Sequence, residues 1–241
     1  MFPARAIWSS LTRYAPGLLL LPMASLLWFA SAPAVATAVR LPDPAIDQQN
    51  TSDELQTVVL AGGCFWGVQA VFQHTKGVQQ AISGYSGGMR TMPRYEEVTT
   101  GRTGHAESVQ IKFNPREITY GQILKIFFSV VHDPTQLNRQ GPDVGTHYRS
   151  AIFYANSDQK RVAEAYIAQL GAAGIFKSPV VTQVSQLTGF YPAEAYHQDY
   201  AIKHPTQPYI AIHDLPKVEN LKQLFPAFYR EVPVTVAAVS Q

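Results

Sequence analysis

The spacing of apolar residues changes along the chain between the pattern of a strand and that of a helix, and the order of these changes constrains the fold most strongly. Short apolar or alternating stretches, each closed by a turn signal, are interleaved with stretches that repeat at helical spacing. The expected elements are strand 57–61, helix 64–74, strand 78–85, strand 105–113, helix 119–131 and strand 150–154. This β-α-β-β-α-β order is that of the split βαβ arrangement. We therefore expect an α+β fold, a two-layer sandwich with a ferredoxin-like core and additional helices and loops.

Local signals add detail to this order. Thr119 and Gln122 have the spacing of a capping box, which predicts that a helix begins between them. A further helix is expected from Asn156 to Gly171, and a further strand from Val180 to Leu187. These elements make one domain, for which we expect the bounds 55–231.

The first 36 residues have the pattern of a secretory signal peptide. They contain Arg5 and Arg13 but no acidic residue, and an apolar run over 17–30 precedes the small residues Ala34-Val35-Ala36. The run is shorter than the roughly 20 residues of a membrane-spanning helix. We expect a cleaved signal peptide over 1–36 and an exported, periplasmic or secreted protein. A retained N-terminal segment that tethers the protein to a membrane is the alternative, and an organellar transit peptide is a weaker one.

The remaining composition narrows the class of protein. Residues 37–54 are polar and contain proline, which predicts a linker, and 232–241 are expected to form a C-terminal tail. The hydrophobic share of 46% argues against a disordered chain. Loss of 1–36 leaves 17 basic and 17 acidic residues. This balance argues against nucleic acid as a partner, and we expect a monomer that does not contact a membrane after cleavage.

Cys64 is the only cysteine of the chain. A single thiol excludes a disulfide within the chain and zinc sites built from several thiolates. Cys64 follows Gly62-Gly63 at the end of a predicted strand and begins a predicted helix. Free backbone N–H groups and the helix dipole would lower the pKa of a thiol there, so we expect a reactive nucleophile. A small, buried, inert side chain is the alternative.

Glu107 is the second candidate. It has the same parity as Val109, Ile111 and Phe113 on an alternating strand, so its carboxyl group should point toward the apolar face. Burial would raise its pKa toward neutrality and make it a general acid. The alternative is a carboxylate at a frayed strand start that reaches solvent or an arginine.

For two further stretches, one polar and one rich in aromatic residues, the residues alone leave both a functional and a purely structural interpretation. Residues 132–150 form a long polar stretch, which is often functional but is equally compatible with a surface loop. Residues 191–200 carry aromatic side chains at helical spacing, which more often serve packing than binding.

Six segments, in order, resemble the A-type peptide methionine sulfoxide reductases. The resemblance extends over about 57–230. The segments are Gly63-Cys64-Phe65-Trp66-Gly67, Gly84-Tyr85-Ser86-Gly87-Gly88, Tyr95-Glu96-Glu97-Val98, Gly104-His105-Ala106-Glu107, 132–150 and 190–200. The fold of this family is a two-layer α+β sandwich, as expected above.

The resemblance implies an enzyme that reduces methionine-S-sulfoxide, free or in proteins, and so repairs oxidised proteins. Cys64 would attack the sulfoxide sulfur as a thiolate while Glu107 protonates the oxygen. The products would be methionine and a sulfenic acid on Cys64.

The remaining roles also follow from the resemblance. Tyr95 and Tyr148 would donate hydrogen bonds to the sulfoxide oxygen, and Asp143 would help to order the site. Phe65 and Trp66 would form the apolar wall that receives the S-methyl group of the substrate.

The chain departs from many family members at the step that resolves the sulfenic acid. Many members carry a later cysteine for this step, but residues 221–241 contain none. An external thiol would then have to reduce Cys64 directly, and thioredoxin, glutaredoxin or glutathione are the expected kinds of reductant. No bound cofactor and no metal are expected.

Two other functions stay open from the residues alone. A cysteine hydrolase would pair Cys64 with one of the seven histidines and form an acyl-enzyme. A binding module without catalysis would keep Cys64 in its core and hold peptides with the aromatic side chains.

Overall fold

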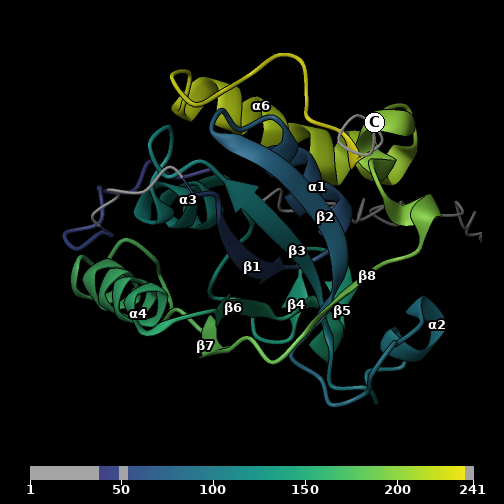
Figure 1. The fold of residues 1–241 in the computed structure, drawn as a ribbon. Helices are drawn as coiled ribbons and strands as arrows, with labels where there is room; N and C mark the ends of the chain where they lie inside the picture. Colours follow the sequence, from purple (N-terminus) through teal and green to yellow (C-terminus); the bar gives the residue numbers. More distant parts are fainter. Residues whose placement is uncertain (1–37, 49–53, 237–241) are drawn as a thin grey trace, which may run out of the picture. The chain divides into compact units, whose positions relative to one another are not determined.

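The computed structural model describes residues 38–48 and 54–236, and the predicted signal peptide lies outside this range. Its main sheet has six strands in the order β7-β6-β1-β3-β2-β8 (Figure 1). The strands are β1 (Gln56–Gly62), β2 (Val78–Ser86), β3 (Ala106–Phe113), β6 (Ser150–Tyr154), β7 (Gln183–Gln186) and β8 (Phe190–Pro192). The inner order β6-β1-β3-β2 is antiparallel throughout, which confirms the expected ferredoxin-like core.

The three predicted helices, over 64–74, 119–131 and 156–171, are present with small changes in their bounds, and the described residues contain three further α-helices that the sequence did not predict. The helices are α1 (Phe65–Gln73), α2 (Tyr95–Val98), α3 (Tyr120–Ile126), α4 (Ser157–Ala172), α5 (Tyr200–Lys203) and α6 (Leu215–Leu224). The capping box at the start of α3 is confirmed, because Thr119 accepts from the Gln122 backbone N–H and donates its own N–H to the Gln122 side chain. After α3 the chain continues as a π-helical turn, Phe127–Val131.

The two faces of the sheet are covered differently. Val58 and Leu60 of β1 belong to the main core, in which residues of α1, α3, α4 and α6 also take part. Their neighbours Val59 and Ala61 point to the other face and join a small cluster under Leu187 and Phe190. Helices α1, α3, α4 and α6 therefore cover one face of the sheet, and the fold is the expected two-layer α+β sandwich (Figure 1).

Two predictions about chain segments need correction. The strand expected over 180–187 is only β7, Gln183–Gln186, and it pairs in parallel with β6. The linker expected over 37–54 is wrong for residues 38–48, which lie against the domain: Leu41 is 1% exposed, and Asp47 accepts hydrogen bonds from Thr119 and Gly121. Proline and polar composition predicted the absence of helix and strand correctly, but they did not reveal the burial of Leu41 or the hydrogen bonds that hold the segment to the domain.

The start of the expected C-terminal tail is also in contact with the domain. The backbone N–H groups of Val234 and Val236 donate to the Gln73 carbonyl and the Asp199 carboxylate. Residues 237–241 lie outside the described range. In the described residues, no helix combines the length and the apolar character needed to cross a membrane.

Leu41→Ala tests whether segment 38–48 contributes to stability. Removing this buried side chain should lower the free energy of unfolding by about 2–4 kcal/mol, because it leaves a cavity in the main core. Urea denaturation measures the change. The matched control is Leu55→Ala, because Leu55 is 48% exposed and its truncation should cost little. Equal, small effects of both substitutions would show that the segment does not stabilise the fold.

Candidate active site

Cys64 lies where β1 passes into α1. Gly63 precedes it with φ of +89°, and a Cβ at Gly63 would come within 2.6 Å of the Gln140 side chain, so both the backbone turn and the close packing require glycine. Cys64 is the N-cap residue of α1 and is 8% exposed. The turn therefore holds the thiol at the helix N-terminus, as the sequence predicts, but nearly out of contact with solvent.

The pKa of Cys64 is raised well above 9, which corrects the expectation that it is lowered. Burial is the main cause, because it removes solvation from the thiolate, and the nearby carboxyl groups of Glu107 and Asp214 raise the pKa further. The backbone N–H of Trp66 and the Lys217 ammonium oppose the shift. The helix N-terminus is thus present, but desolvation and two acidic neighbours outweigh it, and the resting side chain is a thiol.

Glu107 lies on β3 and points into the same region. It is 1% exposed, and its Oε2 accepts a hydrogen bond of 3.0 Å from the backbone N–H of Phe65. Burial raises the pKa of Glu107 to about 8, although the hydrogen bond from Phe65 opposes this. The carboxyl group therefore keeps its proton at neutral pH, which confirms the prediction from strand parity and excludes a frayed, solvated carboxylate.

Two phenols lie near this pair. Tyr95 is the first residue of α2, and Tyr148 ends a short 3₁₀ helix, Thr146–Tyr148. Burial, followed by the charge of Glu107, raises the pKa of Tyr95 to about 12 and that of Tyr148 further, and Cys64 also contributes to both shifts. Both hydroxyl groups are therefore protonated donors at neutral pH, although the two tyrosines follow Cys64 by 31 and 84 residues in the sequence.

Asp143 belongs to the short hairpin of β4 (Arg139–Gln140) and β5 (Asp143–Val144). Its carboxylate accepts a hydrogen bond from the hydroxyl group of Tyr209. Asp143 also raises the pKa of Glu107 and Tyr148 through its charge. The hairpin thus brings part of the polar stretch 132–150 close to the thiol. Asp143 and Tyr148 therefore do not belong to a mere surface loop, which was the alternative for this stretch.

Phe65 and Trp66, the first two residues of α1, form an aromatic wall. Phe65 is buried, with its ring centroid 5.9 Å from that of Tyr85. Trp66 stacks on Tyr200 with centroids 3.9 Å apart and planes 12° from parallel. Tyr200 therefore does more than pack against the core, because it supports Trp66 of this wall.

Comparisons with known proteins agree with this arrangement. The family model "Peptide methionine sulfoxide reductase" matches residues 56–228. The chain is 58% identical to peptide methionine sulfoxide reductase MsrA 2 of Mesorhizobium japonicum over 185 residues, which cover 77% of this chain and 95% of the relative. The chain belongs to the A-type peptide methionine sulfoxide reductase family.

Solved structures support the same assignment. The reductase A of Corynebacterium diphtheriae superimposes with a TM-score of 0.56 at 32% identity, covering 71% of this chain and 90% of that one. Reduced Mxr1 from Saccharomyces cerevisiae gives a TM-score of 0.60 at 29% identity, covering 70% and 96%. The protein is therefore an enzyme that reduces methionine sulfoxide to methionine. The alternatives of a cysteine hydrolase and a non-catalytic binding module lose their support.

Sequence reasoning missed His197 of this reductase. Its Nδ1 accepts a hydrogen bond of 3.2 Å from the Trp66 indole, and its ring lies 4.4 Å from Tyr95 and 5.0 Å from Phe65. Burial lowers the pKa of His197, so the ring is neutral at pH 7 with its proton on Nε2. That Nε2 is buried and has no hydrogen-bond partner among the described residues. The only local signal was the spacing of the aromatics around it, which also fits ordinary packing.

Tyr209 and the buried pair Asp214–Lys217 were missed as well. Tyr209 contacts Trp66 edge to face with centroids 6.1 Å apart, in addition to its bond with Asp143. The Lys217 ammonium donates to Asp214 at 3.0 Å, and the Asp214 carboxylate is completely buried. These residues follow the last recognised motif, and no pattern in 201–217 relates them to Cys64.

The ion pair explains the second glycine of the Cys64 motif. A Cβ on Gly67 would overlap the Asp214 carboxylate and lie 2.8 Å from the Lys217 Nζ. Helix α1 can therefore approach the pair only because Gly67 has no side chain. This close approach brings the Asp214 carboxylate and the Lys217 ammonium near enough to Cys64 to shift its pKa in opposite directions.

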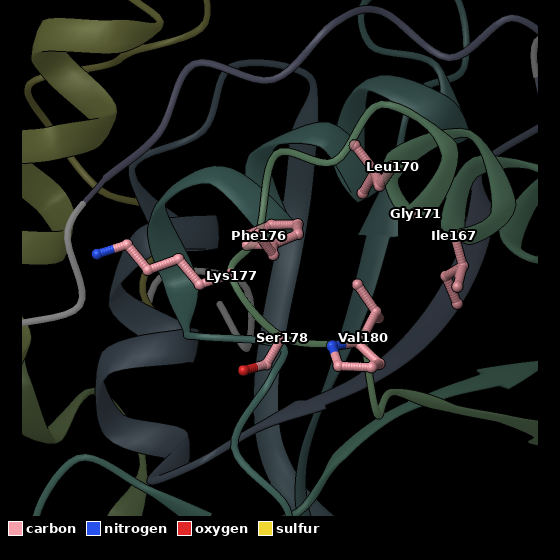
Figure 2. A pocket seen from close by; sticks show the side chains of 8 residues that line it. Ile167, Leu170, Gly171, Phe176, Lys177, Ser178 and Val180 are labelled. Atoms are coloured by element: carbon pink, nitrogen blue, oxygen red, sulfur yellow. The ribbon is translucent and has the colours of Figure 1, made fainter.

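A cavity of about 500 Å³ lies elsewhere, between α4 and residues 176–180. Figure 2 shows Ile167, Leu170 and Gly171 on one side of it and Phe176 and Lys177 on another. None of the candidate site residues lines it. Within the described residues, no group of three or more His, Cys, Asp or Glu side chains is arranged to hold a metal ion.

Gly67→Ala tests the contact between α1 and the ion pair. The added methyl group should lower the free energy of unfolding by about 1–3 kcal/mol, because the completely buried Asp214 cannot move aside without exposing or separating the pair. Gly171→Ala in α4 is the matched control, because a Cβ there meets nothing within 4 Å. The control should be neutral or slightly stabilising, since alanine favours a helix more than glycine does. Equal stabilities of the two variants in urea denaturation would contradict the proposed contact.

Proposed function

We propose that this reductase acts on the S epimer of methionine sulfoxide, free or within proteins, by direct attack of Cys64 on the sulfoxide sulfur. The supporting observation is the pairing of a lone thiol with a buried carboxyl group that keeps its proton at neutral pH. A sulfoxide oxygen becomes a good leaving group only when it is protonated. A neutral Glu107 can supply that proton in a site from which water is largely excluded.

Because the pKa of Cys64 is raised, its side chain rests as a thiol, and the reaction has to generate the thiolate. We propose that the thiol loses its proton only as the reaction proceeds: Glu107 gives its proton to the sulfoxide oxygen, and the resulting carboxylate takes up the proton of Cys64. A bond then forms between Sγ and the substrate sulfur. Transfer of the hydroxyl group to Sγ with cleavage of that sulfur–sulfur bond releases methionine and leaves Cys64 as a sulfenic acid.

Tyr95 and Tyr148 are proposed to donate hydrogen bonds to the sulfoxide oxygen. Their raised pKa values keep both phenols protonated throughout the neutral range. Donors fixed at the position where charge develops stabilise the transition state strongly in a site with little water. Asp143, held by Tyr209, would orient this group of donors.

Phe65 and Trp66 are proposed to receive the methyl group of the substrate. The wall is rigid, because Trp66 is stacked on Tyr200 and hydrogen-bonded to His197. With the methyl group on this wall and the oxygen toward Glu107, only one configuration at sulfur leaves the third substituent directed out of the site. This arrangement favours one epimer, which we assign as S.

The sulfenic acid is proposed to be reduced by an external thiol. Cys64 is the only cysteine in the sequence, so no second thiol of the chain can form a disulfide with it. A thioredoxin, a glutaredoxin or glutathione would attack Cys64 through a mixed disulfide and release water, and a second thiol would regenerate the enzyme.

Single-turnover chemistry with separated epimers tests this function. Without added thiol, an excess of N-acetylmethionine-S-sulfoxide should give one equivalent of N-acetylmethionine per chain and a sulfenic acid on Cys64 that dimedone traps. The R epimer should give no product, and Cys64→Ser should be inactive with both. Several turnovers without thiol, or equal yields from the two epimers, would contradict the proposal.

Glu107→Gln tests the general acid. The amide can still accept the hydrogen bond from Phe65 but has no proton to give, so the rate should fall by roughly a hundredfold or more. In the unaltered enzyme the rate should decline as the pH rises through about 8, where Glu107 loses its proton. This decline should be absent from the remaining activity of the variant.

Stability provides a readout that does not depend on activity. At a pH between the ordinary pKa of 4.5 and the raised value of about 8, Glu107 holds a proton in the folded protein that it releases in the unfolded chain. The stability of the unaltered protein should therefore fall as the pH rises through this window, and Glu107→Gln should lack that part of the fall. The control Glu164→Gln, at an exposed position of α4, should leave the rate and both pH profiles unchanged. An unchanged rate in Glu107→Gln would remove Glu107 from the mechanism.

A further inference from the structure

The loop between β2 and α2 carries the only two methionines of the sequence beyond residue 23. Met89 is 98% exposed and Met92 is 83% exposed. Neither side chain therefore contributes appreciably to the core, and packing gives no reason for an apolar residue at either position. Figure 1 shows this segment and α2 away from the helices that cover the sheet.

The backbone of this loop is held firmly to the domain. The buried His105 ring accepts from the Gly88 N–H at 3.1 Å and bonds the Arg90 carbonyl at 2.7 Å. The Arg90 guanidinium forms two hydrogen bonds with Glu97, whose carboxylate also accepts from the Arg94 N–H. The two thioethers therefore project into solvent from a fixed support.

The same segment leads directly into the active site. Met92 precedes Tyr95 by three residues, and the Tyr95 N–H donates to Glu194 at 3.0 Å while its ring lies against His197. These bonds hold the segment in place at both ends. Met89 and Met92 cannot fold back onto Cys64 of their own chain unless the bonds to His105, Glu97 and Glu194 break.

Chemistry and accessibility together indicate what these methionines do. An exposed thioether reacts with a peroxide to give a sulfoxide and water. Because Cys64 is only 8% exposed, the site can accept a sulfoxide only from a side chain that projects far from its own protein surface. Met89 and Met92 meet this requirement.

We propose that Met89 and Met92 are oxidation sites and that a second copy of the enzyme reduces their sulfoxides. In the second copy, Cys64 would take the oxygen and become a sulfenic acid while the thioether is restored. Two molecules of an external thiol would then regenerate Cys64, giving one disulfide and one water. This inference rests on the proposed function, because it uses the same reaction with the enzyme's own surface as substrate.

A mixing experiment tests the proposal. Isotope-labelled Cys64→Ser chain, checked for its fold by circular dichroism, is oxidised with hydrogen peroxide, and catalase then removes the peroxide. Unlabelled active enzyme, dithiothreitol and N-acetylmethionine sulfoxide are added without unfolding the labelled chain. Trypsin cuts after Lys76, Arg90 and Arg94, so Met89 and Met92 fall in different peptides, and the label identifies the chain they came from.

The active enzyme should remove about half of the sulfoxide from both labelled peptides, because peroxide produces both epimers and each reductase type acts on one. The rate should rise with the concentration of active enzyme. Cys64→Ser enzyme in place of the active enzyme should remove none. A labelled Met89→Leu/Met92→Leu chain, treated in the same way, should show no oxygen added in either peptide.

The outcomes separate the two proposals. Persistence of both labelled sulfoxides while N-acetylmethionine sulfoxide is consumed would overturn this inference and leave the proposed function intact. Reduction of the labelled peptides only after urea is added would overturn it too, since the folded loop would then be inaccessible. If N-acetylmethionine sulfoxide is also left unchanged, the proposed function itself fails.

Discussion

Desolvation of one carboxyl group beside one thiol is the interaction on which the chemistry of this protein depends. Glu107 and Cys64 are both nearly inaccessible to water, and burial raises the pKa of each. A carboxylate and a thiolate in the same apolar site would also repel each other, so both groups rest in their protonated forms. In the mechanism proposed above, Glu107 passes the stored proton to the sulfoxide oxygen, and the thiol becomes a nucleophile only after that transfer.

The last part of the domain completes this site. The hydroxyl group of Tyr209 holds Asp143, His197 holds the Trp66 indole, and Asp214 with Lys217 occupies the space that Gly67 leaves open. The segment over 195–217 therefore reaches the aromatic wall, the polar hairpin and the first turn of α1. Through its charges it also adjusts the pKa of Cys64 in both directions.

Much of this arrangement was predictable, for identifiable reasons. The split βαβ core follows from the order of strands and helices that the spacing of apolar residues predicts. The burial of Glu107 follows from the alternation of inward and outward side chains along β3. Two predictions were wrong, and the bounds of one predicted strand were too wide. The pKa of Cys64 rises because burial and the carboxyl groups of Glu107 and Asp214 outweigh the helix N-terminus, and Asp214 lies 150 residues away in the sequence. Segment 38–48 is not a linker because Leu41 enters the core. The strand expected over 180–187 is shorter, with only Gln183–Gln186 paired.

The sequence by itself determined the element order, the lone thiol at a strand-to-helix turn and the acid on the apolar face of a strand. These depend on local periodicity and on backbone conformations that neighbouring residues specify. Only the tertiary structure decided the protonation of Cys64, the partners of His197 and Tyr209, and the reason for Gly67. Each of these depends on desolvation or on contacts between segments far apart in the chain, and no local pattern of residue types records how much water a folded site excludes.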